Sequence, residues 1–115
     1  MILEERCPTH IALGVISGKW KALILYQLLN HGTTRFGELK KAIPDITSRV
    51  LTKQLRELEA AKLIHRKIYP EVPPRVEYTL SELGYSLKPI FDELNQWGSE
   101  YLESISQTPS LQDIP

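Results

Sequence analysis

Hydroxyl and basic side chains recur along residues 47–56, which read TSRVLTKQLR. Such side chains donate hydrogen bonds to phosphate oxygens and to the acceptor atoms on base edges. Arg49 and Lys53 stand four residues apart, so in a helix they lie on one face and can enter one groove. Ser48 and Thr52 lie off the apolar stripe of the same segment. This spacing indicates contact with a nucleic acid, whereas the alternative is that some of these cations pair within the protein.

Cys7 is the sole cysteine, so the chain forms no internal disulfide. A thiol reacts as the thiolate, which a helix N-terminus or a nearby cation stabilises. Cys7 precedes a predicted helix, and Arg6, His10 and Lys19 are candidate cations. The alternative is a partly buried cysteine that seats the N-terminal arm. Cys7 and His10 have the spacing of a metal-ligand pair, but no second pair accompanies them, so we expect neither a metal site nor a cofactor.

Charge is unevenly distributed along a chain whose net charge is zero. Residues 35–75 contain ten basic and five acidic residues, a balance of +5, and the two flanks carry −5. A basic middle segment can present one face to a polyanion, although the charges can also be scattered over solvated faces. The first residues form no apolar signal segment, and no apolar run could cross a bilayer. We therefore expect a cytoplasmic protein with no membrane partner.

The elements that position these side chains follow from apolar spacing and from the helix-ending residues. Thr9 can cap a short helix that runs to Ile16, and residues 19–30 predict a buried helix. Residues 38–43 predict another short helix, which Pro44 stops.

A second helix follows the turn at residues 44–46, with Thr47 at its N-cap position. Leu51, Leu55 and Leu58 form its apolar stripe, and Val50 and Ala61 are further candidates. A helix, a turn of three to four residues and a second helix constitute a helix-turn-helix unit.

Two runs with a period of two flank the proline-rich stretch YPEVPPRVEY and predict an antiparallel hairpin over residues 63–80. Glu77 on this hairpin should repel a polyanion unless Arg66 or Arg75 braces it. A capping-box pattern at Thr79, with Ser81 as a rival cap, predicts a long helix after the hairpin. Pro89 should kink that helix.

These elements together predict an α+β fold that is mostly helical, namely a winged helix with additional N- and C-terminal helices. We expect a single domain over residues 1–106 and a disordered or frayed tail over residues 107–115. The sequence shows no glycine-rich phosphate loop, no paired carboxylates in an identifiable pocket and no Ser/His/Asp pattern, so we do not expect an enzyme.

The sequence resembles the HxlR-type winged-helix regulators, a branch near the MarR-like group. The matching stretches are CP at residues 7–8, SGKWKALILYQLL, RFGELKKAIPDITSRVLTKQLRELEAAKLI and YPEVPPRVEYTLSELG, with Trp97 downstream. The resemblance covers about residues 7–102. It implies a dimeric transcriptional regulator that binds a pseudo-palindromic operator in double-stranded DNA, with dimerisation through the first and last helices. In a subset of this family, the cysteine of the CP pair senses oxidants or electrophiles. The identity of any small-molecule effector does not follow from the resemblance.

The expected roles of individual residues follow from the usual docking of such a motif on DNA. Base edges are assigned to Ser48, Arg49, Thr52 and Lys53. The DNA backbone is assigned to Thr47, Arg56, Arg35, Lys40 and Lys41, and the wing contacts to Arg75 first, then Arg66 and Lys67. Redox sensing is assigned to Cys7.

Apolar residues at both ends of the chain exceed what one small core can bury, which predicts a homodimer. The expected interface consists of Ile11, Val15, Ile16, Phe91, Leu94, Trp97 and Tyr101. The main alternative function is a winged helix that binds another protein instead of DNA, which the neutral overall charge favours.

Overall fold

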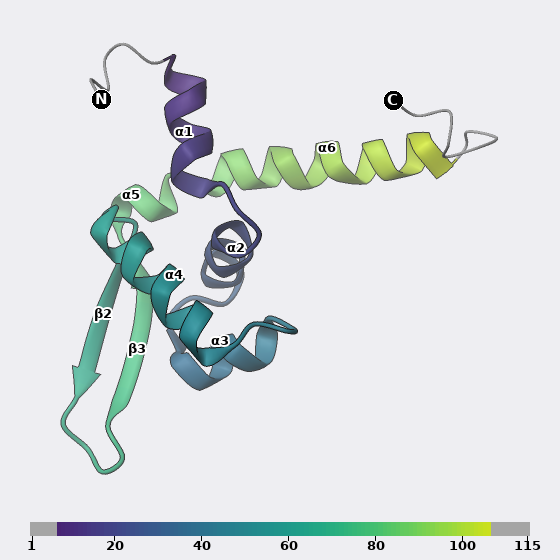
Figure 1. Ribbon diagram of the computed structural model, residues 1–115. Helices are drawn as coiled ribbons and strands as arrows, with labels where there is room; N and C mark the ends of the chain where they lie inside the picture. Colours follow the sequence, from purple (N-terminus) through teal and green to yellow (C-terminus); the bar gives the residue numbers. More distant parts are fainter. Residues whose placement is uncertain (1–6, 107–115) are drawn as a thin grey trace. The chain divides into compact units, whose positions relative to one another are not determined.

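The computed structural model describes residues 7–106 and places a hairpin directly after a helix-turn-helix (Figure 1). The elements in chain order are α1 (Pro8–Ile16), α2 (Lys21–His31), β1 (Thr34–Arg35), α3 (Phe36–Ala42), α4 (Ser48–Ala60), β2 (Ile64–Tyr69), β3 (Arg75–Leu80), α5 (Glu82–Tyr85) and α6 (Lys88–Ser106). The predicted winged helix is confirmed. We call β2, β3 and the loop between them, residues 64–80, the wing.

The chain divides into two compact units, one extending to Tyr85 and the other beginning at Ser86. The first unit contains the helix-turn-helix and the wing, and α6 belongs to the second. The single domain over residues 1–106 stays a prediction, and the predicted tail at residues 107–115 lies outside the described residues. None of the helices in the described part of the chain is long and apolar enough to span a membrane.

Leucine and isoleucine side chains from α2, α3 and α4 form the core of the first unit. Ile24 and Leu28 of α2 and Leu39 of α3 are fully buried. The stripe on α4 is confirmed at Leu51, Leu55 and Leu58, which are equally buried. Val50 is only half-buried, and Ala61, the residue after the end of α4, is exposed. Each buried leucine stabilises the fold by about 1.5–3 kcal/mol through the apolar surface that it removes from water.

A third strand, which the sequence did not predict, joins the wing to the start of α3. The sheet has the order β1-β3-β2, and β1 pairs with β3 in antiparallel register, with Thr34 opposite Tyr78 and Arg35 opposite Glu77. A two-residue strand has no detectable period, so its pairing partner is what defines it. Because β1 leads directly into α3, this pairing anchors the middle of β3 beside the helix-turn-helix.

The base of the wing is fixed by Ser81, which resolves the two rival caps in favour of the serine. The Ser81 hydroxyl donates to the Lys62 carbonyl at 2.7 Å and accepts from the Gly84 amide at 3.0 Å. Gly84 packs against the Leu63 backbone so closely that an added Cβ would collide with the Leu63 carbonyl oxygen. The residue at position 84 must therefore lack a side chain.

The predicted start of the first helix and the predicted course of the last helix are wrong. Helix α1 begins at Pro8, with Cys7 rather than Thr9 at the N-cap position, because proline is favoured in a first turn where its missing N–H is not needed. The predicted long helix is divided into α5 and α6, and Pro89 is the second residue of α6. Pro89 therefore lies in the first turn of α6 and does not kink its middle.

Candidate nucleic-acid interface

The turn between α3 and α4 sets the direction of α4. Ile43 and Ile46 on either side of the turn are buried, and Asp45 between them has φ of 68°, a left-handed conformation that aspartate tolerates. Thr47 caps α4, because its hydroxyl accepts the Val50 amide at 3.1 Å. The predicted N-cap is confirmed, and the first turn of α4 is thereby fixed.

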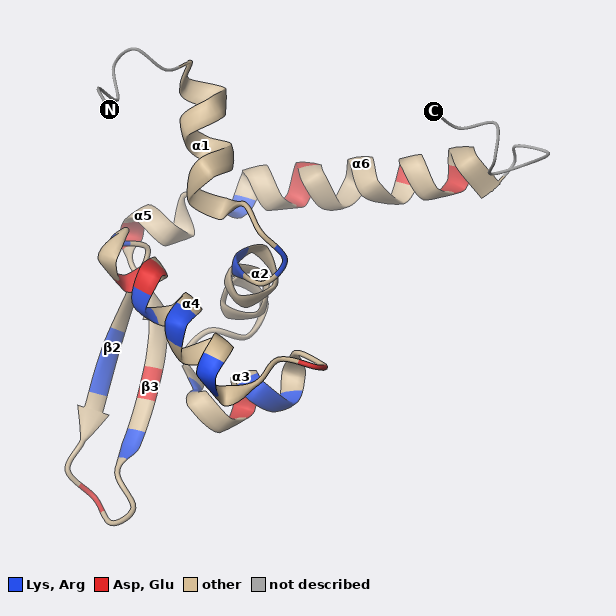
Figure 2. Cartoon of the chain, viewed as in Figure 1, with Lys and Arg blue, Asp and Glu red and all other residues tan. Residues whose placement is uncertain are grey.

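The face of α4 away from the core carries the predicted base-reading residues. Ser48, Arg49 and Lys53 are exposed, and half-buried Thr52 donates its hydroxyl to the Ser48 carbonyl at 2.8 Å. These four residues line one shallow hollow together with Arg56. Basic residues follow one another along α4 in Figure 2. The structure thus brings the set together on one side of one helix.

The cations of this face are free to meet a ligand. No ion pair within residues 7–106 involves Arg49, Lys53 or Arg56. The alternative pairing of Lys53 with Glu57 is not present among the described residues, and Glu57 instead pairs with Lys21 of α2 at 2.8 Å. The hydrogen bond from Lys21 lowers the pKa of Glu57, and the charge of Lys53 contributes to the same direction.

Three further predicted backbone contacts lie around α3. Lys40 and Lys41 are exposed in its last turn, where positive charge also suits the helix dipole. Arg35 precedes its first residue, and the Arg35 amide donates to the Glu38 carboxylate at 2.8 Å. The Arg35 side chain is 3.9 Å from Glu77, so it is engaged with the wing.

The wing cations differ in how much the protein occupies them. Arg66 is 3.5 Å from Glu59 of α4, and its register opposite Tyr78 places it on the other face of the hairpin from Glu77. Lys67 lies 4.8 Å from the centre of the Tyr69 ring and makes no ion pair within the described residues. Lys67 is therefore the most available cation of the three that were predicted.

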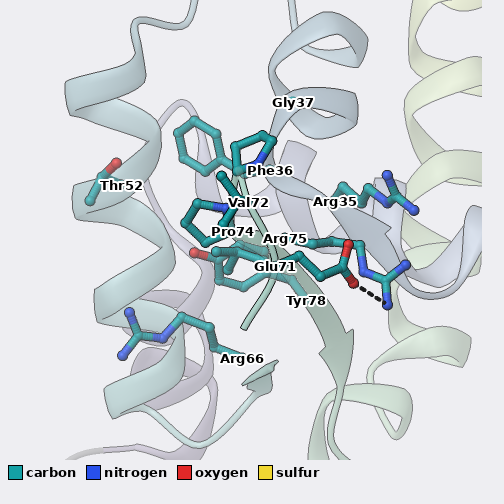
Figure 3. A pocket seen from close by; sticks show the side chains of 12 residues that line it. Arg35, Phe36, Gly37, Thr52, Arg66, Glu71, Val72, Pro74, Arg75 and Tyr78 are labelled. Atoms are coloured by element: carbon teal, nitrogen blue, oxygen red, sulfur yellow. Dashed lines mark ion pairs between the residues drawn. The ribbon is translucent and has the colours of Figure 1, made fainter. Parts of the chain in front are cut away.

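Arg75, the preferred wing contact from the sequence, is held on three sides by the wing itself. It lies 3.2 Å from Glu71, 3.7 Å from Glu77 and 3.8 Å from the centre of the Tyr69 ring. Figure 3 shows the Arg75–Glu71 pair beside the hollow that the wing loop forms with Phe36 and Thr52. Glu77 is thus braced by Arg75, which was one of the two predicted partners. The other predicted partner, Arg66, makes no ion pair with Glu77 within the described residues and pairs with Glu59. Arg35 also braces Glu77, and the sequence did not predict this contact because it did not predict β1.

Cys7 is exposed at the N-cap position of α1. The backbone amides of His10 and then Thr9 lower the pKa of the Cys7 thiol. The sequence left open whether the helix N-terminus or nearby cations would stabilise the thiolate, and the lowered pKa comes from the helix N-terminus. Arg6, one of those candidate cations, lies outside the described residues.

The predicted dimer residues lie on α1 and α6, which we describe separately. On α1, Ile11, Val15 and Ile16 are half-buried, and Leu13 is exposed. On α6, Leu94, Trp97 and Tyr101 are exposed, and the two rings stack with centroids 5.2 Å apart. Phe91 is already buried in the single chain, so it has little surface left for a partner. Ile90 and Leu102 are also exposed on α6, although the predicted interface did not include them.

A helix-turn-helix with an exposed basic face, followed by a paired wing, defines the winged helix-turn-helix class. Within that class the chain belongs to the HxlR-like helix-turn-helix family, whose model matches residues 15–106. The HTH-type transcriptional regulator YkvN of Bacillus subtilis (strain 168) is 55% identical over 97 residues, which cover 84% of this chain and 81% of the relative. The protein is therefore a helix-turn-helix transcriptional regulator, which confirms the expectation that it is not an enzyme.

Two solved structures have the same fold. A transcriptional regulator of the MarR family from Porphyromonas gingivalis W83 is 45% identical, with a TM-score of 0.78 over 87% of this chain and 97% of that one. The redox regulator HypR in its reduced form is 43% identical, with a TM-score of 0.82 over 87% of this chain and 98% of that one. These similarities confirm the predicted family and its kinship with MarR-like regulators.

Proposed function

We propose that the protein binds double-stranded DNA in a sequence-specific manner, as a homodimer, with α4 in the major groove. The observation that carries this proposal is the exposed basic face of α4. Because Arg49 and Lys53 are exposed and make no ion pair within residues 7–106, binding DNA does not require an internal ion pair to be broken. Ser48 and Thr52 supply hydroxyls at the start of the same helix, where such motifs read base edges.

The remaining contacts go to the sugar-phosphate backbone in this proposal. Arg56 lies one turn further along α4, Lys40 and Lys41 lie on α3, and Lys67 is a wing cation without an ion pair in the described part of the chain. Thr47 is occupied as a cap, but its position at the helix N-terminus leaves it beside the amides that attract phosphate. These contacts fix the register of α4 on the duplex without reading sequence themselves.

A dimer doubles the recognition surface and implies a pseudo-palindromic operator, because each copy places one α4 in its own half-site. The exposed rings of Trp97 and Tyr101 on α6 support this part of the proposal, as do the apolar residues of α1. Aromatic and aliphatic groups of this size are costly to leave in water and are enriched in homodimer interfaces. We place the dimer in the cytoplasm, where a regulator of this class has access to DNA.

The deciding experiment is a fluorescence titration of the protein against labelled DNA from upstream of its own gene, repeated over a series of salt concentrations. We expect log Kobs to fall linearly with log salt, and Arg49→Ala to bind more weakly because it loses a contact to a base edge. Affinity that is undetectable for this DNA and for pooled random duplexes would favour the alternative, a winged helix that binds protein.

A redox response through Cys7 is a second proposed property, favoured by one observation. The thiol is exposed and its pKa is lowered at the N-terminus of α1, and a relative with the same fold is described as a redox regulator. Since the chain has one cysteine, two thiols from two copies can join as one disulfide and pass two electrons and two protons to diamide. Diamide should therefore change the DNA affinity of wild-type protein and leave Cys7→Ser unaffected.

A further inference from the structure

Arg75 is enclosed by groups of the wing, although its charge is of the kind that binds DNA. Glu71 on the loop and Glu77 on the same strand flank its guanidinium at 3.2 Å and 3.7 Å, and Tyr69 lies beneath it at 3.8 Å. Tyr69 is also the cross-strand partner of Arg75 in the hairpin register. Arg75 therefore contacts the wing loop through Glu71, its own strand β3 through Glu77 and the neighbouring strand β2 through Tyr69. Together these contacts tie the loop and both strands of the wing to one side chain.

Burial makes Glu77 important to this arrangement. The Nε atom of Arg75 is buried and makes no hydrogen bond within the described residues, and the Glu77 carboxylate lies 3.7 Å from it. The side chain of Glu77 is itself only 20% exposed. A charged donor that is removed from water is stabilised by an opposite charge. Loss of the Glu77 charge would leave the buried Nε atom without its neighbouring carboxylate, although Glu71 would still pair with the outer nitrogen of the guanidinium.

Glu77 also reaches the helix-turn-helix. It is the register partner of Arg35 on β1, and the two side chains are 3.9 Å apart. Arg35 immediately precedes α3, and its amide is bonded to Glu38 in the first turn of that helix. One carboxylate therefore joins the wing cation Arg75 to Arg35, the residue immediately before α3.

We propose that Glu77 and Arg75 are positioning residues that hold the wing in its DNA-binding orientation, and that Arg75 itself makes no phosphate contact. We call Arg35, Tyr69, Glu71, Arg75 and Glu77 the wing brace. The inference rests on the proposed function, because the orientation matters only if the wing meets DNA. It reassigns Arg75, the basic residue nearest the wing loop, from DNA contact to support of the wing.

The sign of one substitution separates positioning from simple electrostatics. Glu77→Gln removes a negative charge from a region that faces a polyanion, so charge alone predicts tighter binding. The wing brace predicts weaker binding, because the substitution removes the carboxylate that links Arg75 to Arg35 and leaves Glu71 as the remaining acidic partner of Arg75 in the brace. Glu77→Asp keeps the charge and should recover part of the lost affinity.

The test measures DNA affinity over a salt series for Glu77→Gln, Arg75→Gln and the double variant. We expect each single variant to bind DNA about tenfold more weakly than wild type. The double variant should bind no more weakly than the single variants, because the effects of substitutions within one network do not add. The salt slope should remain that of wild type in all three. The matched control is Arg56→Gln, which removes a cation that makes no ion pair within residues 7–106 and that the proposed function assigns to the sugar-phosphate backbone. Its loss should reduce the slope by about 0.9.

A second measurement needs no DNA and distinguishes failure of this inference from failure of the proposed function. In the NMR spectrum of free wild type, the Arg75 Hε resonance should be shifted by the Tyr69 ring, and Glu77→Gln should move it towards the position of a solvated arginine. A solvated Arg75 in wild type, tighter binding by Glu77→Gln or a reduced slope in Arg75→Gln would each overturn the inference. A braced Arg75 in a wild type that binds no DNA would overturn the proposed function and the DNA role of the brace.

Discussion

Lys21 of α2 and Glu57 of α4 are joined by an ion pair of 2.8 Å between Nζ and Oε1. The pair links the helix that supports the core to the helix that carries the candidate recognition face. It also occupies the one carboxylate that stands four residues after Lys53 on α4. Glu57 is thus engaged with α2, whereas Lys53, one turn earlier on the same face of α4, makes no ion pair within residues 7–106.

Replacing Glu57 by glutamine should reduce the pH dependence of stability in acid. The pKa of Glu57 is lowered in the folded protein, chiefly by the hydrogen bond from Lys21, so the unfolded chain binds more protons as pH falls. The stabilisation is present above the unfolded pKa of about 4.3 and is lost as pH falls through the lower folded pKa. Urea unfolding between about pH 3 and pH 7 should show a smaller acid loss in Glu57→Gln.

The matched control for that measurement is Glu93→Gln, which removes an exposed carboxylate from α6 that makes no ion pair within the described residues. Its pH profile should follow that of wild type. Parallel profiles for wild type and Glu57→Gln would contradict the proposed link between α2 and α4.

Removing the cap of α4 should destabilise the protein without touching the core. The Thr47 hydroxyl satisfies the Val50 amide at 3.1 Å, and Thr47→Ala leaves that amide to water. The expected loss in the free energy of unfolding is about 1 kcal/mol. Urea denaturation measures it, and Thr47→Ser, which keeps the hydroxyl, should lose much less. Equal losses in the two variants would show that the methyl group, and not the cap, is responsible.

Gly84 is required by close packing at the base of the wing. An added Cβ at this position lies closer to the Leu63 carbonyl oxygen and to the Leu80 side chain than van der Waals contact allows, so Gly84→Ala must displace backbone. We expect a loss of about 1–3 kcal/mol in the free energy of unfolding. In the control Gly98→Ala on α6, nothing lies within 4 Å of the new Cβ, and alanine favours a helix by about 0.5–1 kcal/mol. The melting temperature should therefore fall in Gly84→Ala and rise in Gly98→Ala, relative to wild type.

The dimer depends on the exposed aromatic side of α6 in our proposal. Trp97→Glu places a charge where a 65% exposed indole would enter the interface, and burial of an unpaired charge is costly. Sedimentation should show a dimer for wild type and a monomer for Trp97→Glu. Ser99→Glu adds the same charge about 200° around the same helix axis and should remain dimeric. A wild type that sediments as a monomer at micromolar concentration would remove the dimer from the proposal.

The sequence was sufficient for those parts of the fold that rest on local signals. The leucine spacing of α4, the cap at Thr47 and the alternation of β2 and β3 each depend on a few neighbouring residues, and each is present. The strand β1 was missed because two residues carry no period, and only their pairing with Tyr78 and Glu77 defines them. Because β1 was not predicted, part of the contact network around Glu77 in the candidate interface was not predicted either. Without β1 there was no reason to place Arg35 beside Glu77, and Arg75 was judged by its charge and not by its neighbours.

Cys7 should react with alkylating reagents at a lower pH in the folded protein than in the unfolded chain. The backbone amides of His10 and Thr9 lower its pKa, and α1 must be formed to hold them beside the thiol. The reactive species is the thiolate, so the midpoint of the rate of iodoacetamide labelling against pH reports this pKa. Labelling with and without urea should give a lower midpoint in the native state, whereas coincident midpoints would show that the N-terminus of α1 does not activate the thiol. Both measurements use the same cysteine in the same sequence and the same reagent. The difference between the native and unfolded midpoints therefore reports the effect of the folded helix on the pKa of Cys7.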